Sequence, residues 1–490
     1  MNSINVVICG RNQVTASVIR MLRRIKSVNI IGYWCESSSN QLYADVAGIR
    51  VINGTLEDLL SNKDIQFLLL CDTPINQNNL ICRLHGLSTK QPANLKLSDI
   101  PYVIIMPPVS PIYDIDMLEK LKSRVSFAMP LRQLPLSAVL CSHLSCKPQK
   151  TRLSNYEFIQ LPTHWFLGNM ESIHIRLSTV SFVDGGEYSW LYESESMGGG
   201  LLNMFCPGLI DLVFSLTGGR QMASVTSICR TFGVDSENHH FRRISADDYV
   251  TVMGELDVPT SPNLCKPVIV IIIKSNIPFI GDRSFKRSEA YFHDNHYFKL
   301  EVEVSGSNGC FLINESERKI SWTPRKPVSP KFEYASVESE TRLTRLNHGD
   351  HFHDQRPKSV EESALEEACN GNTLVNSVGS NLSRTYFGTM LKIDFEKLDE
   401  TTEVAHLSPN DSLPYMELGE GVQDCCLSAT GEAWTNWVNN LTRSFSSEWK
   451  SLEILSASPS HWGYIQSVMH AIIKSAQLRC WVNVQTGERM

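Results

Sequence analysis

"INVVICGRNQVTASVIRMLRRIKS", residues 4–27, decides the fold of this chain. Its first part reads as a buried strand, and apolar side chains then recur at helical spacing from Val14 to Ile25. Gly10 stands between the two and permits a tight bend. A strand, a glycine turn and a helix in this order predict the first unit of a doubly wound nucleotide-binding fold, in which N–H groups at the helix start face a pyrophosphate.

The segments that follow keep alternating between strands and helices. Apolar strands are expected at 29–35, 49–52, 65–74, 101–111 and 125–135, and helices at 14–27, 56–63 and 114–123. Near-continuous apolar strands that alternate with helices are typical of a parallel sheet covered on both faces. We therefore predict an α/β class protein whose residues 1–163 form a Rossmann-type dinucleotide-binding domain.

The second half of the chain has a different periodicity. Alternating strands are expected at 171–183, 250–256, 268–274, 299–306 and 309–314, with a tight hairpin turn at 307–309 and a closing helix and short strand within 461–484. Residues 317–380 are poor in apolar side chains and rich in Pro, Ser, Glu and Arg, which predicts a disordered insertion. A second polar stretch spans about 398–425. The C-terminal domain is thus expected over 164–316 plus 381–490.

The composition excludes several classes of function. A net charge of −7 and a pI near 6.1 argue against a nucleic-acid or anionic-membrane surface. Apolar runs are only strand-length, and the N-terminus lacks the pattern of a signal peptide. The cysteines are scattered without a Cys-x-x-Cys pair, which favours reduced thiols. The chain is expected to be cytoplasmic.

Six motifs in register carry a resemblance to a known family. They are "DTP" (72–74), "LRQLP" (131–135), "YSWLYESESMGGGL" (188–201), "LIDLVFSLTGG" (209–219), "ISADDYVTV" (244–252) and "FKLEVEVSGSNGCFLI" (298–313). With them the chain resembles the glucose–fructose oxidoreductase / inositol dehydrogenase / MocA (Gfo/Idh/MocA) family, and within it the animal glucose–fructose oxidoreductase domain-containing proteins.

The resemblance implies a C-terminal domain with a large open, mainly antiparallel sheet. The exposed face of that sheet usually pairs with another subunit, so a homodimer is expected, while protein partners beyond it stay unknown. It also implies a secreted or extracellular-matrix location as the alternative to the cytoplasm. The expected cofactor is NAD or NADP.

Residues of the first half are candidates to hold that cofactor. The glycine pattern is reduced to Gly10, and small Ala16 can replace the glycine that lets helix and strand pack closely. Glu36 can accept a hydrogen bond from the adenosine ribose, which favours NAD. The alternative is a strand–turn–helix that binds nothing. The candidate cofactor-binding residues are Gly10, Arg11, Asn12, Gln13, Glu36, Thr73 and Pro74.

The family transfers hydride between a nicotinamide and a sugar or polyol carbon, and this requires a base for the substrate hydroxyl. Typical members use the Lys of a Glu-Lys-Pro turn and a helix with Asp-x-Gly-x-His-x-x-Asp, which ends here at Asp211. The Lys, Asp and His positions are Pro107, Met204 and Gly208. No residue is therefore predicted to be catalytic, and Pro207 is expected to kink or delay the helix.

Other polar residues near the motifs have ordinary structural interpretations. Capping or turn roles are favoured for Asp211, Asp247 and Asp248. His348, His351 and His353 invite a metal reading but lack fixed geometry, so no metal is predicted. The candidates for a substitute base are Asn203, Cys206, Tyr188, Glu193, Glu195 and His164.

Three hypotheses about function follow. The favoured one is an oxidoreductase-like fold that binds NAD(P), has lost or severely impaired catalysis, and serves as a regulatory or scaffold protein. The second is an active NAD(P)-dependent oxidoreductase on a sugar-like or polyol substrate with a relocated base. The third is an interaction protein that binds no nucleotide.

Overall fold

A computed structural model gives the fold of this chain. It describes residues 3–10, 13–23, 25–35, 48–90, 100–107, 115–121, 124–144, 161–180, 199–231, 246–257, 266–277, 298–325, 393–397, 402–407, 433–434, 437–438 and 456–490. The chain divides into two units, 1–325 with 386–490 and 326–385, and the second unit lies outside the described residues. Among the described residues, no helix combines the length and apolarity that crossing a membrane would need.

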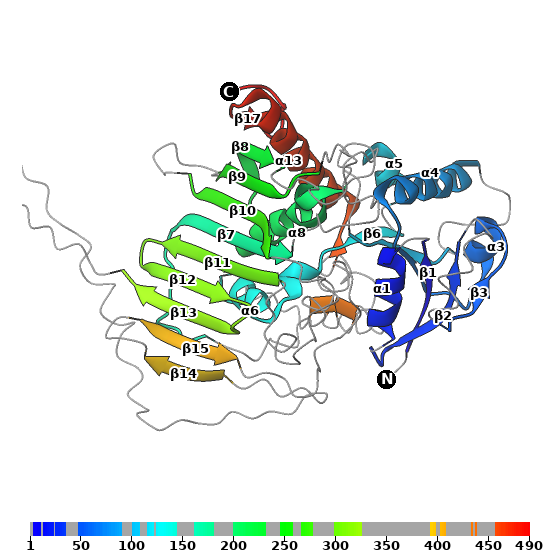
Figure 1. The fold of residues 1–490 in the computed structure, drawn as a ribbon, viewed down its shortest axis with the longest axis horizontal. Coiled ribbons are helices and arrows are strands. Elements are labelled where there is room, and N and C mark those ends of the chain that lie inside the picture. The colour runs from blue at the N-terminus through cyan, green and yellow to red at the C-terminus, as the bar shows by residue number, and fades with distance from the viewer. Residues whose placement is uncertain are drawn as a thin grey trace, which may run out of the picture. The chain divides into compact units, whose positions relative to one another are not determined.

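The N-terminal sheet has the order β16-β6-β5-β4-β1-β2-β3 (Figure 1). Its strands are β1 (Ile4–Cys9), β2 (Val28–Trp34), β3 (Val51–Ile52), β4 (Phe67–Leu70), β5 (Tyr102–Ile105), β6 (Val125–Ala128) and β16 (Ser456–Ala457). All neighbours are parallel except β16, which pairs antiparallel with β6 at the edge. The strand order from β3 to β6 is that of the doubly wound fold, and this prediction is confirmed.

Alternate residues of each strand face opposite sides of this sheet. On one side Val6 and Ile8 of β1 belong to a buried cluster with Ile19 of α1 (Gln13–Leu22). Trp434 and Trp437 complete that cluster, their rings packed edge to face. A segment late in the chain therefore covers part of the first sheet, which the sequence did not predict.

On the other side of the sheet lie three helices from the first half of the chain. These are α3 (Leu56–Ser61), α4 (Pro74–Lys90) and α5 (Ile115–Lys120). Leu59, Leu84 and Leu118 from these helices share a buried cluster with Val7 and Leu68 of the sheet. A sheet buried on both faces explains why its strands read as continuous apolar runs.

The second sheet is larger and mixed. Its order is β14-β15-β13-β12-β11-β7-β10-β9-β8-β17, and all neighbours are antiparallel except β7 and β10. Its strands are β7 (Met170–Val180), β8 (Met222–Arg230), β9 (Tyr249–Leu256), β10 (Val268–Ile277), β11 (Phe298–Gly306), β12 (Gly309–Asn314), β13 (Lys319–Pro324), β14 (Ile393–Lys397), β15 (Glu403–Leu407) and β17 (Val482–Asn483). The mainly antiparallel sheet and the hairpin between β11 and β12 are confirmed.

Helices cover one face of this sheet, as Figure 1 shows. α8 (Gly200–Leu216) packs on β9 and β10, and α13 (Pro459–Leu478) packs on β8. The Ser227 hydroxyl of β8 donates to the Ile472 carbonyl of α13 over 2.6 Å. The opposite face carries exposed apolar side chains, which are Ile228, Met253, Val268 and Leu312.

Several boundaries differ from the sequence-based expectations. α1 ends at Leu22, and β6 ends at Ala128 instead of running to 135. After β6 come the short helix η2 (Pro130–Gln133) and α6 (Pro135–Leu144), which was not predicted. β13 lies inside the expected insertion 317–380, and β15 lies inside the expected polar stretch 398–425. For β13 the prediction of disorder was wrong, because strand pairing in the sheet stabilises sequences that are polar on one face.

Candidate functional site

The turn after β1 is built around Gly10. A Cβ atom on Gly10 would overlap the Thr15 hydroxyl of α1 and the Cys71 carbonyl at the end of β4. The Thr15 hydroxyl donates to that same carbonyl, and the Tyr33 hydroxyl donates to the Gly10 carbonyl. Only glycine therefore fits this position, where helix, turn and two strands meet. Thr15 was missed by the sequence analysis, since its role depends on Cys71.

The turn after β4 holds the predicted Thr73 and Pro74. The Asp72 carboxylate accepts hydrogen bonds from the Thr73 N–H over 2.6 Å and from the Asn76 amide over 2.9 Å. Pro74 is the first residue of α4, where its missing N–H has no helical partner to lose. The Thr73 hydroxyl is buried and has no hydrogen-bond partner in the described part of the chain.

Gln77 closes the gap between the ends of β4 and β5. Its amide nitrogen lies within hydrogen-bond distance of three carbonyls, at 3.3 Å from Leu70, 3.0 Å from Asp72 and 2.9 Å from Met106. Because its amide is occupied in this way, Gln77 fixes the two turns to each other.

A cavity of about 90 Å³ opens where β1, β2 and β4 end. Its wall includes Gly10 and Cys9 from β1, Trp34 from β2, and Asp72 after β4. This is the crevice at which doubly wound sheets bind ligands, because connections from adjacent strands leave there in opposite directions.

α4 supplies the outer wall of the cavity. Asn76, Asn79, Leu80 and Arg83 all line it, and they lie on successive turns of one helix face. The cavity therefore combines apolar, amide and cationic groups, a set that suits a polar ligand with an aromatic ring.

Burial keeps two thiols near the cavity, Cys9 and Cys71, protonated at neutral pH. Burial raises the pKa of the Cys9 thiol, and nearby Cys35 and Asp72 raise it further. Burial likewise raises the pKa of Cys71 well above its ordinary value. A phosphate near Gly10 would thus meet no thiolate at either residue.

Only part of the predicted cofactor set can be placed. Gly10 lines the cavity, whereas Thr73 and Pro74 follow the lining residue Asp72 without belonging to the wall. Arg11, Asn12 and Glu36 lie outside the described residues, as does the side chain of Gln13.

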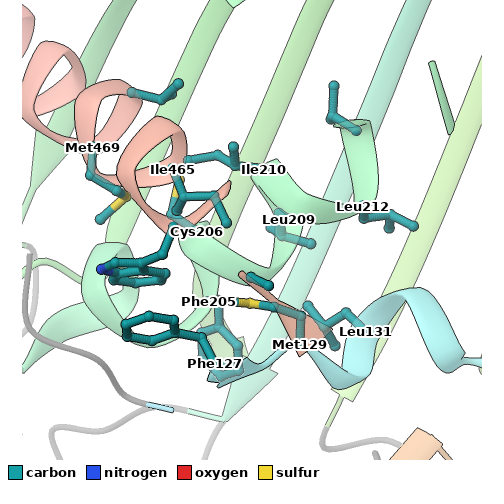
Figure 2. Close-up of a cluster of buried hydrophobic side chains, with 14 of the residues drawn as sticks. Phe127, Met129, Leu131, Phe205, Cys206, Leu209, Ile210, Leu212, Ile465 and Met469 are labelled. Carbon is teal, nitrogen blue, oxygen red and sulfur yellow. The ribbon is translucent and has the colours of Figure 1, made fainter. Parts of the chain in front are cut away.

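Two of the positions at which the resembling family has catalytic groups, Gly208 and Met204, lie against a packed apolar cluster. A Cβ atom on Gly208 would lie 2.9 Å from Leu131 Cδ1, so a larger side chain there requires Leu131 to move. Met204 packs against the same buried cluster. Figure 2 shows Met129 and Leu131, from the segment after β6, in one cluster with Phe205 and Leu209 of α8. Pro107 lies just after β5 and is half-buried.

The effect expected of Pro207 was wrong in one respect. α8 begins at Gly200 and runs through Pro207 to Leu216, so the proline does not delay the helix. Packing of the helix on both sides holds it in place, since Cys206 and Leu209 are fully buried. Tertiary contacts thus outweigh the local disadvantage of proline.

Asp247 has the capping role that was predicted. Its carboxylate accepts a hydrogen bond from the Leu202 N–H over 2.8 Å, and its carbonyl accepts one from Leu201 over 3.0 Å. Gly200 has φ +88°, and a Cβ atom there would lie 2.6 Å from Asp247 Oδ1. Burial raises the pKa of Asp247 to about 6, against the opposing effect of the Leu202 N–H.

Asp211 lies in a buried ionic cluster. Its Oδ1 is 2.8 Å from His461 Nε2 of α13, and its Oδ2 is 3.4 Å from Arg132 Nε of η2. The Asp211 side chain is 0% exposed, while those of Arg132 and His461 are each 13% exposed. The structural role predicted for Asp211 agrees with these contacts, whereas Arg132 and His461 were missed as its partners.

Three of the candidate substitute bases lie in the described part of the chain: His164, Cys206 and Asn203. His164 is exposed, and its Nε2 lies 2.7 Å from Glu403 of β15, which also accepts from the Trp165 indole. Burial raises the pKa of Cys206, so this thiol stays protonated. Asn203 donates to the Gly199 carbonyl over 3.0 Å within its own helix start.

The remaining candidates cannot be placed. Tyr188, Glu193 and Glu195 lie outside the described residues, as do His348, His351 and His353. Within the described ranges, no group of three His, Cys, Asp or Glu side chains is arranged to hold a metal ion.

Comparison with solved structures identifies similar folds. An oxidoreductase domain protein from Kribbella flavida has a TM-score of 0.55 at 11% identity, covering 99% of this chain and 100% of that one. Levoglucosan dehydrogenase, in complex with NADH and levoglucosan, has a TM-score of 0.55 at 12% identity with the same coverage. An oxidoreductase from Agrobacterium radiobacter, in complex with NAD⁺, L-tartaric acid and magnesium, has a TM-score of 0.55 at 10% identity, covering 99% of each chain.

No family model matches the chain, and no curated protein matches it. The chain shares the fold of these oxidoreductases. It combines a doubly wound sheet with a large open sheet. The identities of 10–12% establish this fold alone.

Proposed function

We propose that this chain binds NAD or NADP beside Gly10, does not transfer hydride, and acts as a regulatory or scaffold protein. The cavity at the ends of β1, β2 and β4 supports nucleotide binding, because Gly10 lines it and α1 begins three residues later, at Gln13. A bound nicotinamide would supply a hydride donor or acceptor. The residues of this chain would still have to take the proton from a substrate hydroxyl.

The contact between Gly208 and Leu131 carries the proposal that catalysis is lost. At the position where the resembling family has its histidine, the helix surface packs directly on Leu131, with 2.9 Å left for a Cβ atom. Met204 and Pro107 occupy the other two positions and cannot titrate. General acid–base catalysis contributes typically ~10²–10⁴-fold to rate, and none of these three residues can provide it.

A second candidate function rests on the Asp211–His461 pair. A histidine oriented by a buried carboxylate is the arrangement of a general base. Asp211 is shared with Arg132, however, and none of these three residues lines the cavity beside Gly10. The ring of His461 also lies against Phe214, with centroids 4.3 Å apart. We therefore assign a structural role to the Asp211–His461 pair. If the chain does turn over a substrate, His461 is the first residue to test as its general base.

The test combines binding and turnover on the full chain. Calorimetric titration with NAD, NADH, NADP and NADPH should give saturable binding of at least one of them. Incubation with NAD⁺ or NADP⁺ and a panel of sugars and polyols should leave nicotinamide absorbance unchanged, with levoglucosan dehydrogenase and levoglucosan as the positive control. Turnover that His461→Asn abolishes would establish the second candidate. Absence of any nucleotide binding would favour the interaction protein.

The packing at Gly208 gives a direct structural test. Gly208→His should lower the free energy of unfolding by ~1–3 kcal/mol, as overpacked cores do. Leu131→Ala in the same chain should recover part of that loss, since it removes the atoms that the new side chain meets. Denaturant unfolding of the two single variants and the double variant measures this coupling. Additive effects would show that the two positions do not touch.

We also propose that the chain forms a homodimer through the open face of the second sheet. Ile228, Met253 and Val268 are 52%, 40% and 36% exposed on neighbouring strands of that face. Exposed apolar side chains gathered on one surface are typical of protein interfaces.

A further inference from the structure

Building on the proposed function, we infer that the cavity recognises only the adenosine diphosphate half of a dinucleotide and leaves the nicotinamide half without a binding site of its own. The chain would then take ADP, ADP-ribose and NAD as equivalent ligands. This is a sensor of adenine nucleotides on an oxidoreductase fold.

The wall between β2 and α4 suits an adenine ring. Leu80 and Arg83 lie three residues apart on one face of α4, and they line the cavity together with Trp34 and Cys35 from the end of β2. An aliphatic side chain and a guanidinium on the same wall can contact the face of a flat aromatic base, the guanidinium through a cation–π interaction. Asn79 at the exposed rim offers both a donor and an acceptor to the base edge.

Another part of the cavity wall suits a ribose, whose hydroxyls can donate hydrogen bonds to a carboxylate. Asp72 and Asn76 line it and are held together by a 2.9 Å hydrogen bond, so their remaining polar atoms are fixed in direction. Gly10 also lines the cavity, and α1 begins three residues after it. Phosphates beside Gly10 would lie near the N-terminal end of that helix, where the helix dipole favours negative charge.

The other half of the crevice does not offer equivalent groups. In a doubly wound sheet the nicotinamide half must extend past the ends of β4, β5 and β6. Among the described residues, those that directly follow β5 and β6 have no side-chain hydrogen-bonding group: Met106, Pro107, Met129, Pro130 and Leu131. The next residue, Arg132, has its Nε 3.4 Å from Asp211 Oδ2. Gln77 lies at this point, and its amide nitrogen is occupied by three carbonyls.

The size of the cavity agrees with this division. Its volume of about 90 Å³ encloses a ring-sized group, and the described residues of its wall include none from the ends of β5 or β6. Pockets that enclose drug-sized ligands run to ~300–1,000 Å³. Met129 and Leu131, which would have to part for a nicotinamide, are instead 1% and 6% exposed within the packed cluster of Figure 2.

The inference is tested by comparing the binding of NAD with that of its two halves, ADP-ribose and nicotinamide mononucleotide. In calorimetry on the full chain, ADP-ribose and NAD should bind with dissociation constants within about threefold of each other, since a tenfold gap would require ~1.4 kcal/mol of added contacts. Nicotinamide mononucleotide should not compete. In saturation-transfer NMR with NAD, the adenine protons should receive saturation and the nicotinamide protons should not.

A matched pair of variants locates the site. Arg83→Met should weaken ADP-ribose and NAD by the same factor, roughly threefold to tenfold for a lost cation–π contact. Arg230→Met, at an exposed position on β8, should change neither. Arg83→Lys keeps the charge but not the planar guanidinium, so its binding should fall between wild type and Arg83→Met.

The outcomes separate this inference from the proposed function. NAD binding more than about tenfold tighter than ADP-ribose, or saturation of nicotinamide protons equal to that of adenine, would overturn the inference while leaving nucleotide binding intact. Turnover of a sugar or polyol would overturn the proposed loss of catalysis. Failure of every adenine nucleotide to bind would overturn both.

Discussion

Gly10 is the residue on which the first turn depends, because both atoms that a side chain would meet belong to neighbouring segments. Gly10→Ala should lower the free energy of unfolding by ~1–3 kcal/mol, since the added methyl overlaps the Cys71 carbonyl and the Thr15 hydroxyl. Gly86→Ala is the control, as a Cβ atom on Gly86 in α4 would meet nothing within 4 Å. That change should raise stability by up to ~1 kcal/mol through helix propensity. Equal effects of the two variants in denaturant unfolding would contradict the packing argument.

Asp247 should make stability depend on pH. Burial raises its pKa from an ordinary value of 3.8 to about 6. The folded chain thus holds the proton more tightly than the unfolded chain, so the contribution is complete below about pH 4 and is lost as the pH rises through about 6. The total loss of unfolding free energy over this pH range should be on the order of 2–3 kcal/mol. Asp247→Asn should remove this pH dependence, because asparagine does not titrate.

Urea unfolding of wild type and Asp247→Asn across pH 4–7 measures the difference. Asp257→Asn, at an exposed position just after β9, is the control and should keep the wild-type slope. An unchanged slope in Asp247→Asn would mean that another group carries the dependence.

At this scale the sequence predicts what is local. Gly10 is recognisable because a bend follows a buried strand. For Asp247 the sequence favours a capping or turn role, but it does not show that the capped residue is Leu202, 45 positions away. The partners of Asp211 are not recognisable, since His461 lies 250 residues away and meets it only through the packing of α13 on α8. The cavity-lining residues of α4 were missed for the same reason, as no motif marks Leu80 or Arg83.

Three elements meet at the ionic cluster: η2, α8 and α13. Asp211→Asn should lower the free energy of unfolding by ~3–5 kcal/mol, because it leaves the Arg132 guanidinium buried without its counter-charge. Glu171→Gln removes a partner of Arg325 in a pair whose side chains are 53% and 44% exposed, and should change stability by less than ~1 kcal/mol. Thermal or urea unfolding of the two variants measures the difference; guanidinium chloride is avoided because this salt screens ion pairs. A small effect of Asp211→Asn would mean that the apolar contacts of α8 alone fix its position.

Elements with strong periodicity are predictable, and those stabilised by distant residues are not. The strands of the first sheet follow from their continuous apolar runs. α6 was missed because its start depends on Glu315, whose carboxylate accepts from the Ser137 N–H over 2.6 Å although 178 residues separate them. β14 and β15 have only five residues each. They join the sheet because β15 pairs with β13 and β14 pairs with β15.

For the whole molecule, the open face of the second sheet decides the state of association. Met253→Glu should shift a homodimer to monomer, since it places a charge among the apolar side chains of β8, β9 and β10. Leu478→Glu is the control, because Leu478 is 49% exposed at the end of α13, away from that face. Sedimentation equilibrium distinguishes the two. A wild-type monomer at all concentrations would remove the proposed dimer.

The late position of β16 and α13 in the chain has a consequence for folding during synthesis. β16 supplies the edge partner of β6, and Trp462 stacks on Phe127 with ring centroids 4.5 Å apart. β16 and Trp462 are translated only after residue 455, long after the strands of the first sheet have left the ribosome. The nascent N-terminal half therefore emerges with an unsatisfied sheet edge and an uncovered phenylalanine, and it has to wait, or be chaperoned, until the far end of the chain is translated.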